Sequence, residues 1–447
     1  MDQPIAGATS ARPLIVTNRH VLGIAVPMTL AYLTTPLIGV TDTAVVGRLD
    51  DAALLGGLAV GAITFDVVFG TFNSLRSGTT GLVAQAFGRG DEREQSAVLL
   101  RAVSLALLIG SLLILLTPAI IAVSSYLIGP EADVAAAMAV YVGIRMLAAP
   151  LTLTNYSILG YILGRGEGGL ALALQFLLNG VNIALSIFLG LSLGWGIEGV
   201  AWGTVIGELA AVLVGGGLLA RRLRGHEPVG WKRVFDLAAM GQMLALNRDI
   251  MIRSFALLGA FALFTRQGAQ LGTVTLAANA ILMNIFLIAG FFLDGFATAA
   301  EQLAGRAIGA RQRDAFNRAV SLSSIWGFVL AFILAGLFLL AGETFIKLLT
   351  TSEEVRSASI AYLPWAALTA VSGVLAFQMD GVFIGATWSR DMRNMMLISL
   401  AIYATCMLTL GHLLGNAGLW AALHVFLIAR GLSLIAILPK RVKQTFG

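Results

Sequence analysis

Charge is scarce in this sequence. Charged residues make up 12% of its 447 residues, against about 25% in a typical soluble domain. A soluble fold of this size would have too little charge to cover its surface. Hydrophobic residues make up 58%, and the mean hydropathy is +0.87. The apolar excess therefore has to face lipid, and the sequence predicts an all-α polytopic membrane protein.

Cysteine and the common motifs of soluble enzymes are also lacking. Cys406 is the only cysteine, which excludes a disulfide framework and a thiol-based metal site. The four histidines show no metal-ligand spacing, and no P-loop for ATP phosphates is present. We therefore expect no cofactor, no metal and no enzymatic activity, and the energy source of any transport is then an ion gradient.

Long apolar segments are abundant instead, and each has about the 20 residues that a membrane-spanning helix needs. The most polar stretch, Arg221–Asp236, separates six such segments from six others. The twelve expected spans are 21–46, 53–80, 97–124, 133–163, 168–191, 196–220, 240–265, 273–303, 316–349, 355–386, 393–413 and 417–438. The expected divisions are an N-terminal cytoplasmic segment at 1–20, an N-lobe at 21–220, a linker at 221–239, a C-lobe at 240–438 and a basic tail at 439–447.

Lysine and arginine are distributed unevenly over the expected loops. If both termini are cytoplasmic, 20 of the 29 basic residues lie on that side, five lie within spans and four lie on the other side. This bias predicts that both termini lie on the cytoplasmic side of a plasma membrane, which in a bacterium is the inner membrane. It also explains the basic pI without nucleic acid, so the expected partners are lipid and amphipathic small molecules, and the expected state is a monomer.

A short motif occurs at the same place in both halves. The sequence Arg-Ala-Val-Ser-Leu occupies residues 101–105 after the second span and residues 318–322 after the eighth. Because each half has six spans, the two halves share one orientation. Parallel repeats of this kind are typical of transporters that hold a substrate between the halves and expose it alternately to each side.

An acid within the first span indicates a function, because a charge at mid-membrane costs about 2.5–3.5 kcal/mol on insertion scales. Asp42 has no basic residue within four positions. An apolar cavity would favour its neutral form and let it take up a proton, whereas a carboxylate near the outer interface, close to Arg48, would remain solvated. Pro27 lies about four turns earlier and predicts a bend in this helix, which could respond to Asp42 or be static.

Other charged residues within spans are candidates for either transport or structural ion pairs. Asp66, Asp294 and Asp380 could line a substrate cavity or hold the bundle together. We favour structural ion pairs for three embedded arginines: Arg76, Arg145 and Arg253. Asp249 and Arg253 are four residues apart at the start of the seventh span, which predicts a local pair.

Uncharged polar and aromatic residues complete the set of candidates. Asn179 and Asn182 in the fifth span could hydrogen-bond a substrate, a sodium ion or Asp42, or could simply join helices. Met28 and Tyr32 in the first span could line a lipophilic cavity, although most such residues face lipid or core.

Several runs of residues are similar to known motifs. They are Asp42–Leu49 with Ala53–Gly56, Leu75–Ala86, Asn247–Ile250, Ala299–Glu301, and Asp380–Thr387 with Met392–Asn394. Together they resemble the DinF-type branch of the multidrug and toxic compound extrusion (MATE) family. The resemblance covers all twelve spans. It implies two six-helix lobes that form a V, and a secondary antiporter that exports lipophilic, often cationic small molecules by alternating access.

The resemblance also implies roles for single residues. It assigns the coupling proton to Asp42, the helix bend to Pro27 and a supporting amide to Asn182. Similar proteins often have an aspartate four residues after that amide, where this sequence has Ser186. The missing acid favours proton coupling over sodium coupling, which stays the alternative.

Two other functions remain open at this point. A lipid-linked oligosaccharide flippase of the wider superfamily would need basic residues in its cavity to hold pyrophosphate, and Arg76 and Arg145 are embedded. A membrane scaffold or receptor without a transport cycle would not need the internal repeat or the isolated acid in the first span.

Overall fold

The structure, a computed structural model, describes residues 14–224 and 229–447. Arg12 of the expected N-terminal segment and residues 225–228 of the expected linker lie outside these ranges. Within them the chain is helical and contains no β-strand, which confirms the all-α expectation. The first half contains α1 (Asn18–Val46), α2 (Ala52–Phe72), α3 (Ser74–Gly88), α4 (Glu92–Ile128), α5 (Ala132–Met146), α6 (Ala149–Gly164), α7 (Gly168–Ile187) and α8 (Gly196–Leu223). After the short α9 (Trp231–Val234) come α10 (Leu237–Gln270), α11 (Thr273–Gly309), α12 (Arg313–Leu349), α13 (Glu353–Gly385), α14 (Ser389–Leu414) and α15 (Asn416–Phe446).

The expected twelve spans correspond to these helices. In the described part, 10 spans are long and apolar enough to cross a membrane, with α2 and α3 counted together. Helices α5 and α6, bent by 51° at a short break, make an eleventh. The twelfth, α10, has 34 residues but is more polar because it contains Arg248, Asp249 and Arg253. The multi-pass character expected from composition is confirmed.

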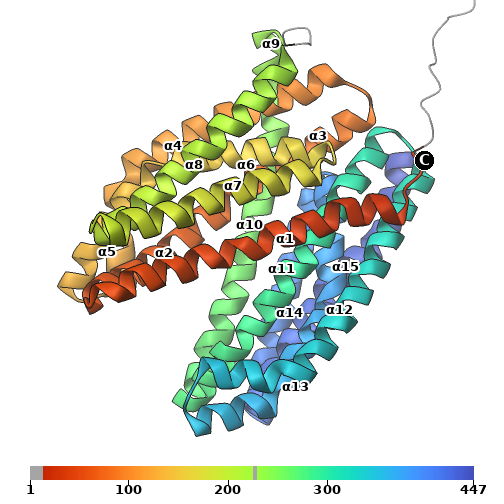
Figure 1. The fold of residues 1–447 in the computed structure, drawn as a ribbon. Helices are drawn as coiled ribbons and strands as arrows, with labels where there is room; N and C mark the ends of the chain where they lie inside the picture. Colours follow the sequence, from red (N-terminus) through yellow and green to blue (C-terminus); the bar gives the residue numbers. More distant parts are fainter. Residues whose placement is uncertain (1–13, 225–228) are drawn as a thin grey trace, which may run out of the picture.

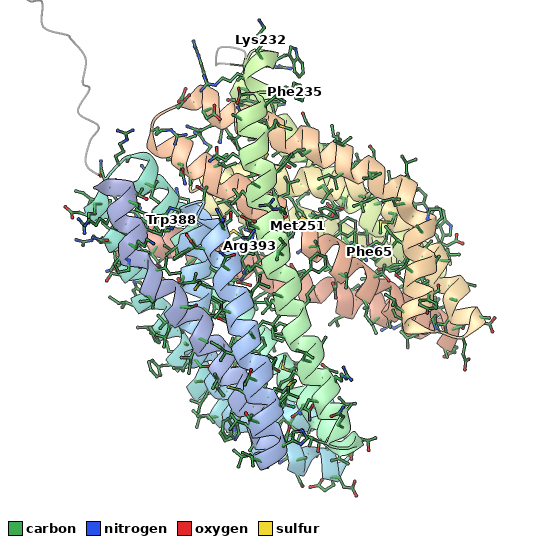
Figure 2. The ribbon with its side chains drawn as sticks, turned by 180° about the vertical axis from the view of Figure 1, so that it is seen from behind. Phe65, Lys232, Phe235, Met251, Trp388 and Arg393 are labelled. Atoms are coloured by element: carbon green, nitrogen blue, oxygen red, sulfur yellow. The ribbon has the colours of Figure 1, made fainter. Side chains whose placement is uncertain are left out.

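The helices form two lobes. The N-lobe (α1–α8) and the C-lobe (α10–α15) approach each other at one end and diverge toward the other, which gives the ribbon the shape of a V (Figure 1). We call the joined end, which carries α9 and the C-terminus, the linker end. Helix α10 starts there, beside Lys232 and Phe235, and runs along the C-lobe past Met251 (Figure 2).

Glycines bring the two lobes into backbone contact at the linker end. A Cβ built on Gly88 of α3 would lie 2.1 Å from the carbonyl oxygen of Arg306 in α11. A Cβ built on Gly309 of α11 would lie 2.0 Å from that of Gln85 in α3. Residue 309 follows residue 88 by 221 positions, and residue 306 follows residue 85 by the same number. The same contact is therefore made twice, about a pseudo-two-fold axis.

Each lobe also contains a close helix crossing of its own, and the two crossings are related by the same offset in sequence. A Cβ built on Gly160 of α6 would lie 2.5 Å from the carbonyl oxygen of Arg76 in α3. A Cβ built on Gly381 of α13 would lie 2.2 Å from the carbonyl oxygen of Ala297 in α11. These pairs are again 221 positions apart. Small residues allow such close crossings in membrane bundles. The parallel repeat expected from the sequence is confirmed.

Side-chain amides also join the lobes at the linker end. Gln85 Nε2 of the N-lobe donates to the carbonyl oxygen of Gly385, at the end of α13, at 2.9 Å. Gln302 Nε2 of the C-lobe donates to the carbonyl oxygen of Gly164, at the end of α6, at 3.4 Å. Gly164 and Gly385 are equivalent in the repeat, so each lobe caps a helix of the other.

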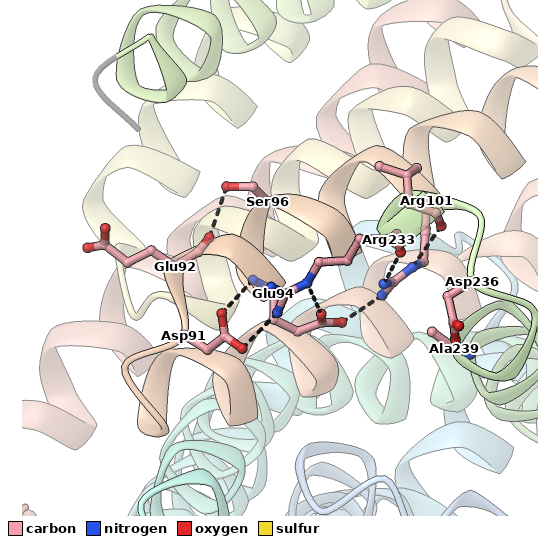
Figure 3. Close-up of polar contacts among 9 residues, drawn as sticks. Asp91, Glu92, Glu94, Ser96, Arg101, Arg233, Asp236 and Ala239 are labelled. Carbon is pink, nitrogen blue, oxygen red and sulfur yellow. Dashed lines mark hydrogen bonds and ion pairs between the residues drawn. The ribbon is translucent and has the colours of Figure 1, made fainter. Parts of the chain in front are cut away.

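The linker is anchored on the N-lobe by charged residues (Figure 3). Arg101 of α4 is buried and donates to the carbonyl oxygens of Val234 and Arg233 at 2.9 and 2.7 Å. Arg233 in turn pairs with Asp91 at 2.8 Å and Glu94 at 3.1 Å. The repeated pentamer thus begins with a residue that fixes the linker, although the equivalent Arg318 is exposed.

Asp91 also begins α4, where its carboxylate accepts a hydrogen bond from the backbone N–H of Glu94 at 2.9 Å. Burial by itself would raise the pKa of Asp91. The Glu94 hydrogen bond and the Arg233 guanidinium outweigh that effect and hold the pKa of this carboxyl below its ordinary value.

Candidate coupling and transport site

The acid of the first span is buried inside the N-lobe. Asp42 is 4% exposed, so it is not solvated beside the exposed Arg48. Its Oδ1 has no hydrogen-bond partner among the described residues. Ser186 lies beside the carboxyl group, and Arg145 acts on it through space without forming an ion pair in the described part of the chain. This leaves a desolvated carboxylate with an oxygen that is free to take up a proton.

Helix α7 supplies the polar groups beside Asp42. Asn182 and Ser186 are four residues apart and lie on one face of the helix. Asn182 Nδ2 donates to the Thr204 hydroxyl of α8 at 2.9 Å, and Ser186 Oγ donates to Asn182 Oδ1 at 3.4 Å. Both side chains are buried. The structure therefore brings together the three residues proposed from the sequence for ion coupling.

Three other candidates, Asn179, Met28 and Pro27, lie in α7 and α1. Asn179 Nδ2 of α7 donates to the Thr34 hydroxyl of α1 at 2.5 Å, so this amide joins two helices. Met28 is buried in the core. Helix α1 continues without interruption through Pro27, and the bend expected there stays a prediction.

Two further charged residues of the N-lobe have contacts that the sequence did not indicate. Glu208 of α8 is buried, and its Oε2 accepts a hydrogen bond from Asn155 Nδ2 at 2.6 Å. Its position within the sixth span was the available signal. Arg145, expected in an ion pair, instead donates to the Tyr141 hydroxyl at 2.7 Å and lies 4.1 Å from the ring centre of Phe65. That expectation was wrong because aromatic groups satisfy this guanidinium.

Residues between the lobes form a second polar group. Tyr32 of α1 shares a hydrogen bond with Thr298 of α11 at 2.9 Å. Arg76 lies 6.0 Å from the Tyr32 ring and is influenced electrostatically by Glu301 and Asp294. Glu301 is buried with an unpartnered Oε1, whereas Asp294 is exposed in the middle of its helix. Arg76 makes no ion pair in the described part, so the structural pair expected for it was wrong.

Two other acids of the C-lobe, Asp380 and Asp249, are neutralised by ion pairs. Asp380 of α13 is buried between Arg253 of α10 and Arg430 of α15, and the Arg430 distance is 2.7 Å. Asp249 pairs with Arg393 of α14 at 2.7 Å. The local Asp249–Arg253 pair expected from the sequence is wrong, because the two side chains turn toward different neighbouring helices.

The acids within the N-lobe spans differ from Asp380 and Asp249 in this respect. Asp42 and Glu208 of the N-lobe, and the exposed Asp66 on α2, have no ion-pair partner among the described residues, and all three lie near Arg145. In that part of the chain no group of three or more His, Cys, Asp or Glu side chains is arranged to hold a metal ion. A carboxylate held in this way can exchange a proton or pair transiently with a cationic ligand.

Comparisons with known proteins agree with this architecture. The model of the MatE family matches residues 27–188 and 250–418. The DNA damage-inducible protein F of Escherichia coli (strain K12) is 38% identical over 434 residues, which cover 95% of this chain and 92% of that protein. A probable multidrug resistance protein NorM of Deinococcus radiodurans is 28% identical and covers 96% of this chain and 97% of its own.

A solved structure has the same fold. It shows the outward-facing conformation of a multidrug resistance MATE family transporter of the MOP superfamily, and it superposes with a TM-score of 0.86 over 96% of both chains. The sequence identity is 17%, so this likeness concerns the fold alone.

Proposed function

The chain is a multi-pass membrane transporter of the MatE family, and we propose that it exports lipophilic, often cationic small molecules in exchange for protons. The observation that carries the proposal is the unpaired carboxylate of Asp42, buried beside Asn182 and Ser186. Transport changes the location of the substrate and not its covalent structure, so no enzymatic step is involved.

The exchange follows from the charge of one carboxyl group. When Asp42 is ionised, its desolvated charge favours a cation in the cavity. A proton taken up by the carboxyl group removes that charge and weakens cation binding, so the substrate leaves. The proton then returns to water on the other side of the membrane, and the site regains its charge. A ligand that binds one state better shifts the conformational equilibrium by its differential affinity.

Movement of the two lobes would supply alternating access. We place the linker end and both termini in the cytoplasm, supported by the excess of basic residues on that side. The conformation with the lobes joined there then opens toward the outside of a plasma membrane. The glycine contacts of α3 and α11 would separate when the transporter opens inward.

Competing functions fit the charges less well. A pyrophosphate-holding flippase needs free arginines in its cavity, whereas Arg253 and Arg430 pair with Asp380. Arg145 donates to the Tyr141 hydroxyl, and Arg76, which has no ion pair in the described part, donates to Asn73 and Ser77 on its own helix turn. Sodium coupling remains the second candidate for the ion, because the oxygens of Asn182 and Ser186 lie beside Asp42.

The test is transport in proteoliposomes. We expect an imposed proton gradient to drive the efflux of a cationic dye by the wild type, and Asp42→Asn to reduce the rate at least tenfold because its amide cannot carry the proton. Asp133→Asn is the matched control, since it removes an exposed acid from the start of α5.

The outcomes separate the alternatives. Efflux driven by a sodium gradient and lost in Asp42→Asn would replace the proton by sodium at the same site. Gradient-driven efflux that Asp42→Asn leaves unchanged would refute the role of Asp42. No dye movement under either gradient would contradict the drug-exporter proposal.

A further inference from the structure

A basic pocket lies at the linker end, apart from the coupling site. It has a volume of about 300 Å³ and lies between the start of α1, the α6–α7 connection and α11, so that both lobes contribute to it. Its charged and polar lining residues are Arg19, His20, Arg165, Gln302 and Arg306. No carboxylate is among its lining residues in the described part of the chain.

Two of these arginines come from different lobes and share one aromatic ring. The guanidinium carbons of Arg165 and Arg306 lie 5.3 and 4.8 Å from the ring centre of Phe87. Arg165 also bonds Glu167 at 3.0 Å, but Arg306 has no ion pair in the part of the chain that the structure describes. Two like charges held on one ring repel each other, and an anion between them would relieve that repulsion.

Further groups favour an anion here. Helix α1 begins at the pocket, and its first turn contains no acidic residue, so its partial positive charge is unopposed there. Gln302 is 1% exposed, and its side-chain oxygen has no partner among the described residues. That buried oxygen can accept a hydrogen bond from a protonated phosphate or from a water that accompanies it.

The arginines of this pocket are not repeated in the two halves of the chain. The residues equivalent to Arg165 and Arg306, found 221 positions away, are Ala386 and Gln85. A basic bias on the cytoplasmic side explains exposed arginines in loops. It does not explain an arginine of α11 that is only partly exposed and lies against a ring of the other lobe.

We propose that this pocket binds a phosphate group and thereby holds the lobes together at the linker end. Guanidinium groups match the oxygens of phosphate with paired hydrogen bonds. Because Arg19 and Arg165 belong to the N-lobe and Arg306 to the C-lobe, the anion bridges the two. The binding step stands on the pocket alone, and its effect on the transport cycle rests on the proposed alternating access.

A phosphate group can come from an anionic lipid or from solution, and the experiment separates the sources. The full chain is placed in phosphatidylcholine nanodiscs and titrated with inorganic phosphate, and separately placed in mixed discs in which bound phosphatidylglycerol is counted after purification. We expect binding from at least one source, weakened at least tenfold in Arg306→Gln. Arg318→Gln is the control, because it removes an exposed arginine of α12 at the same end.

Binding that is equal in both variants, or absent from both sources, would overturn the proposal. The second measurement is the distance between spin labels at Gly169→Cys and Asp314→Cys, one exposed position in each lobe, in a Cys406→Ser background. We expect the phosphate source to enrich the short distance in the wild type and not in Arg306→Gln. Binding without this change would refute the bridging role, and a failure of dye transport would leave both readouts unaffected.

Discussion

The glycine contact between α3 and α11 predicts that one methyl group shifts the balance between the conformations. In Gly309→Ala, the added Cβ would lie 2.0 Å from the carbonyl oxygen of Gln85, whereas an ordinary contact needs about 3.4 Å. The two backbones must therefore separate by roughly 1 Å or more. Overpacking of this kind costs about 1–3 kcal/mol. Because the lobes touch there only when they are joined at the linker end, the cost falls on that conformation, which should lose about 5- to 150-fold in relative population.

The assay is the distance between spin labels at the linker end, measured with and without Gly309→Ala. The matched control is Gly259→Ala in α10, where an added Cβ meets nothing within 4 Å. That control should stabilise its helix by about 0.5–1 kcal/mol and leave the distances unchanged. If Gly309→Ala keeps the short distance as fully as Gly259→Ala does, the contact does not hold the lobes together.

The other predictions concern two acids with structural roles. Asp380→Asn should destabilise the protein by about 3–5 kcal/mol, because it leaves Arg253 and Arg430 buried without a counter-charge. Asp42→Asn should preserve the unfolding temperature in detergent, because Asp42 has no ion pair to lose. Equal losses of unfolding temperature in the two variants would contradict a structural role for Asp380 alone. Asp91→Ala should cost about 1 kcal/mol at neutral pH through the lost helix cap. Since the folded state holds the pKa of Asp91 below its ordinary value, its contribution is present above about pH 4 and lost as the pH falls below that value. Thermal unfolding of both proteins at pH 7 and pH 3 should therefore show a difference that narrows in acid, and a constant difference would refute the assignment.

The course of the chain through the membrane was predictable because hydrophobicity is a local property. Every expected span corresponds to a helix or a bent pair of helices, and the observed helices extend beyond the expected spans by a few residues at most ends. The bend between α5 and α6 was not predicted. Pro150 lies at the start of α6, where proline is compatible with a new helix, but hydropathy alone reads the two helices as one span.

Partners of charged residues were less predictable, because they depend on how helices face each other. Asp249 and Arg253 are neighbours on one helix, yet each is paired with a residue more than 100 positions away. Spacing along a helix defines which groups can meet locally, but a neighbouring helix that offers a buried charge competes for the same side chain. The proposed coupling acid, Asp42, was easier to single out, because an isolated acid in an apolar span is rare.

The repeat explains why the scaffold is symmetric and the chemistry is not. Glycines at the helix crossings occur in both halves, because both need the same close approach of backbones. Charged residues on the same helices are not repeated: Glu301 is equivalent to Thr80, and Asp380 to Leu159. A duplicated scaffold supplies two lobes that can rock about one axis, whereas a single coupling acid must belong to one lobe. If a second acid at the equivalent depth were left equally unpaired, two protons could bind independently, and the exchange would lose its fixed ratio. Asp380 is held between two arginines, whereas Asp42 has no ion-pair partner among the described residues. Of these two buried aspartates, Asp42 is therefore the one whose charge can change during the proposed cycle.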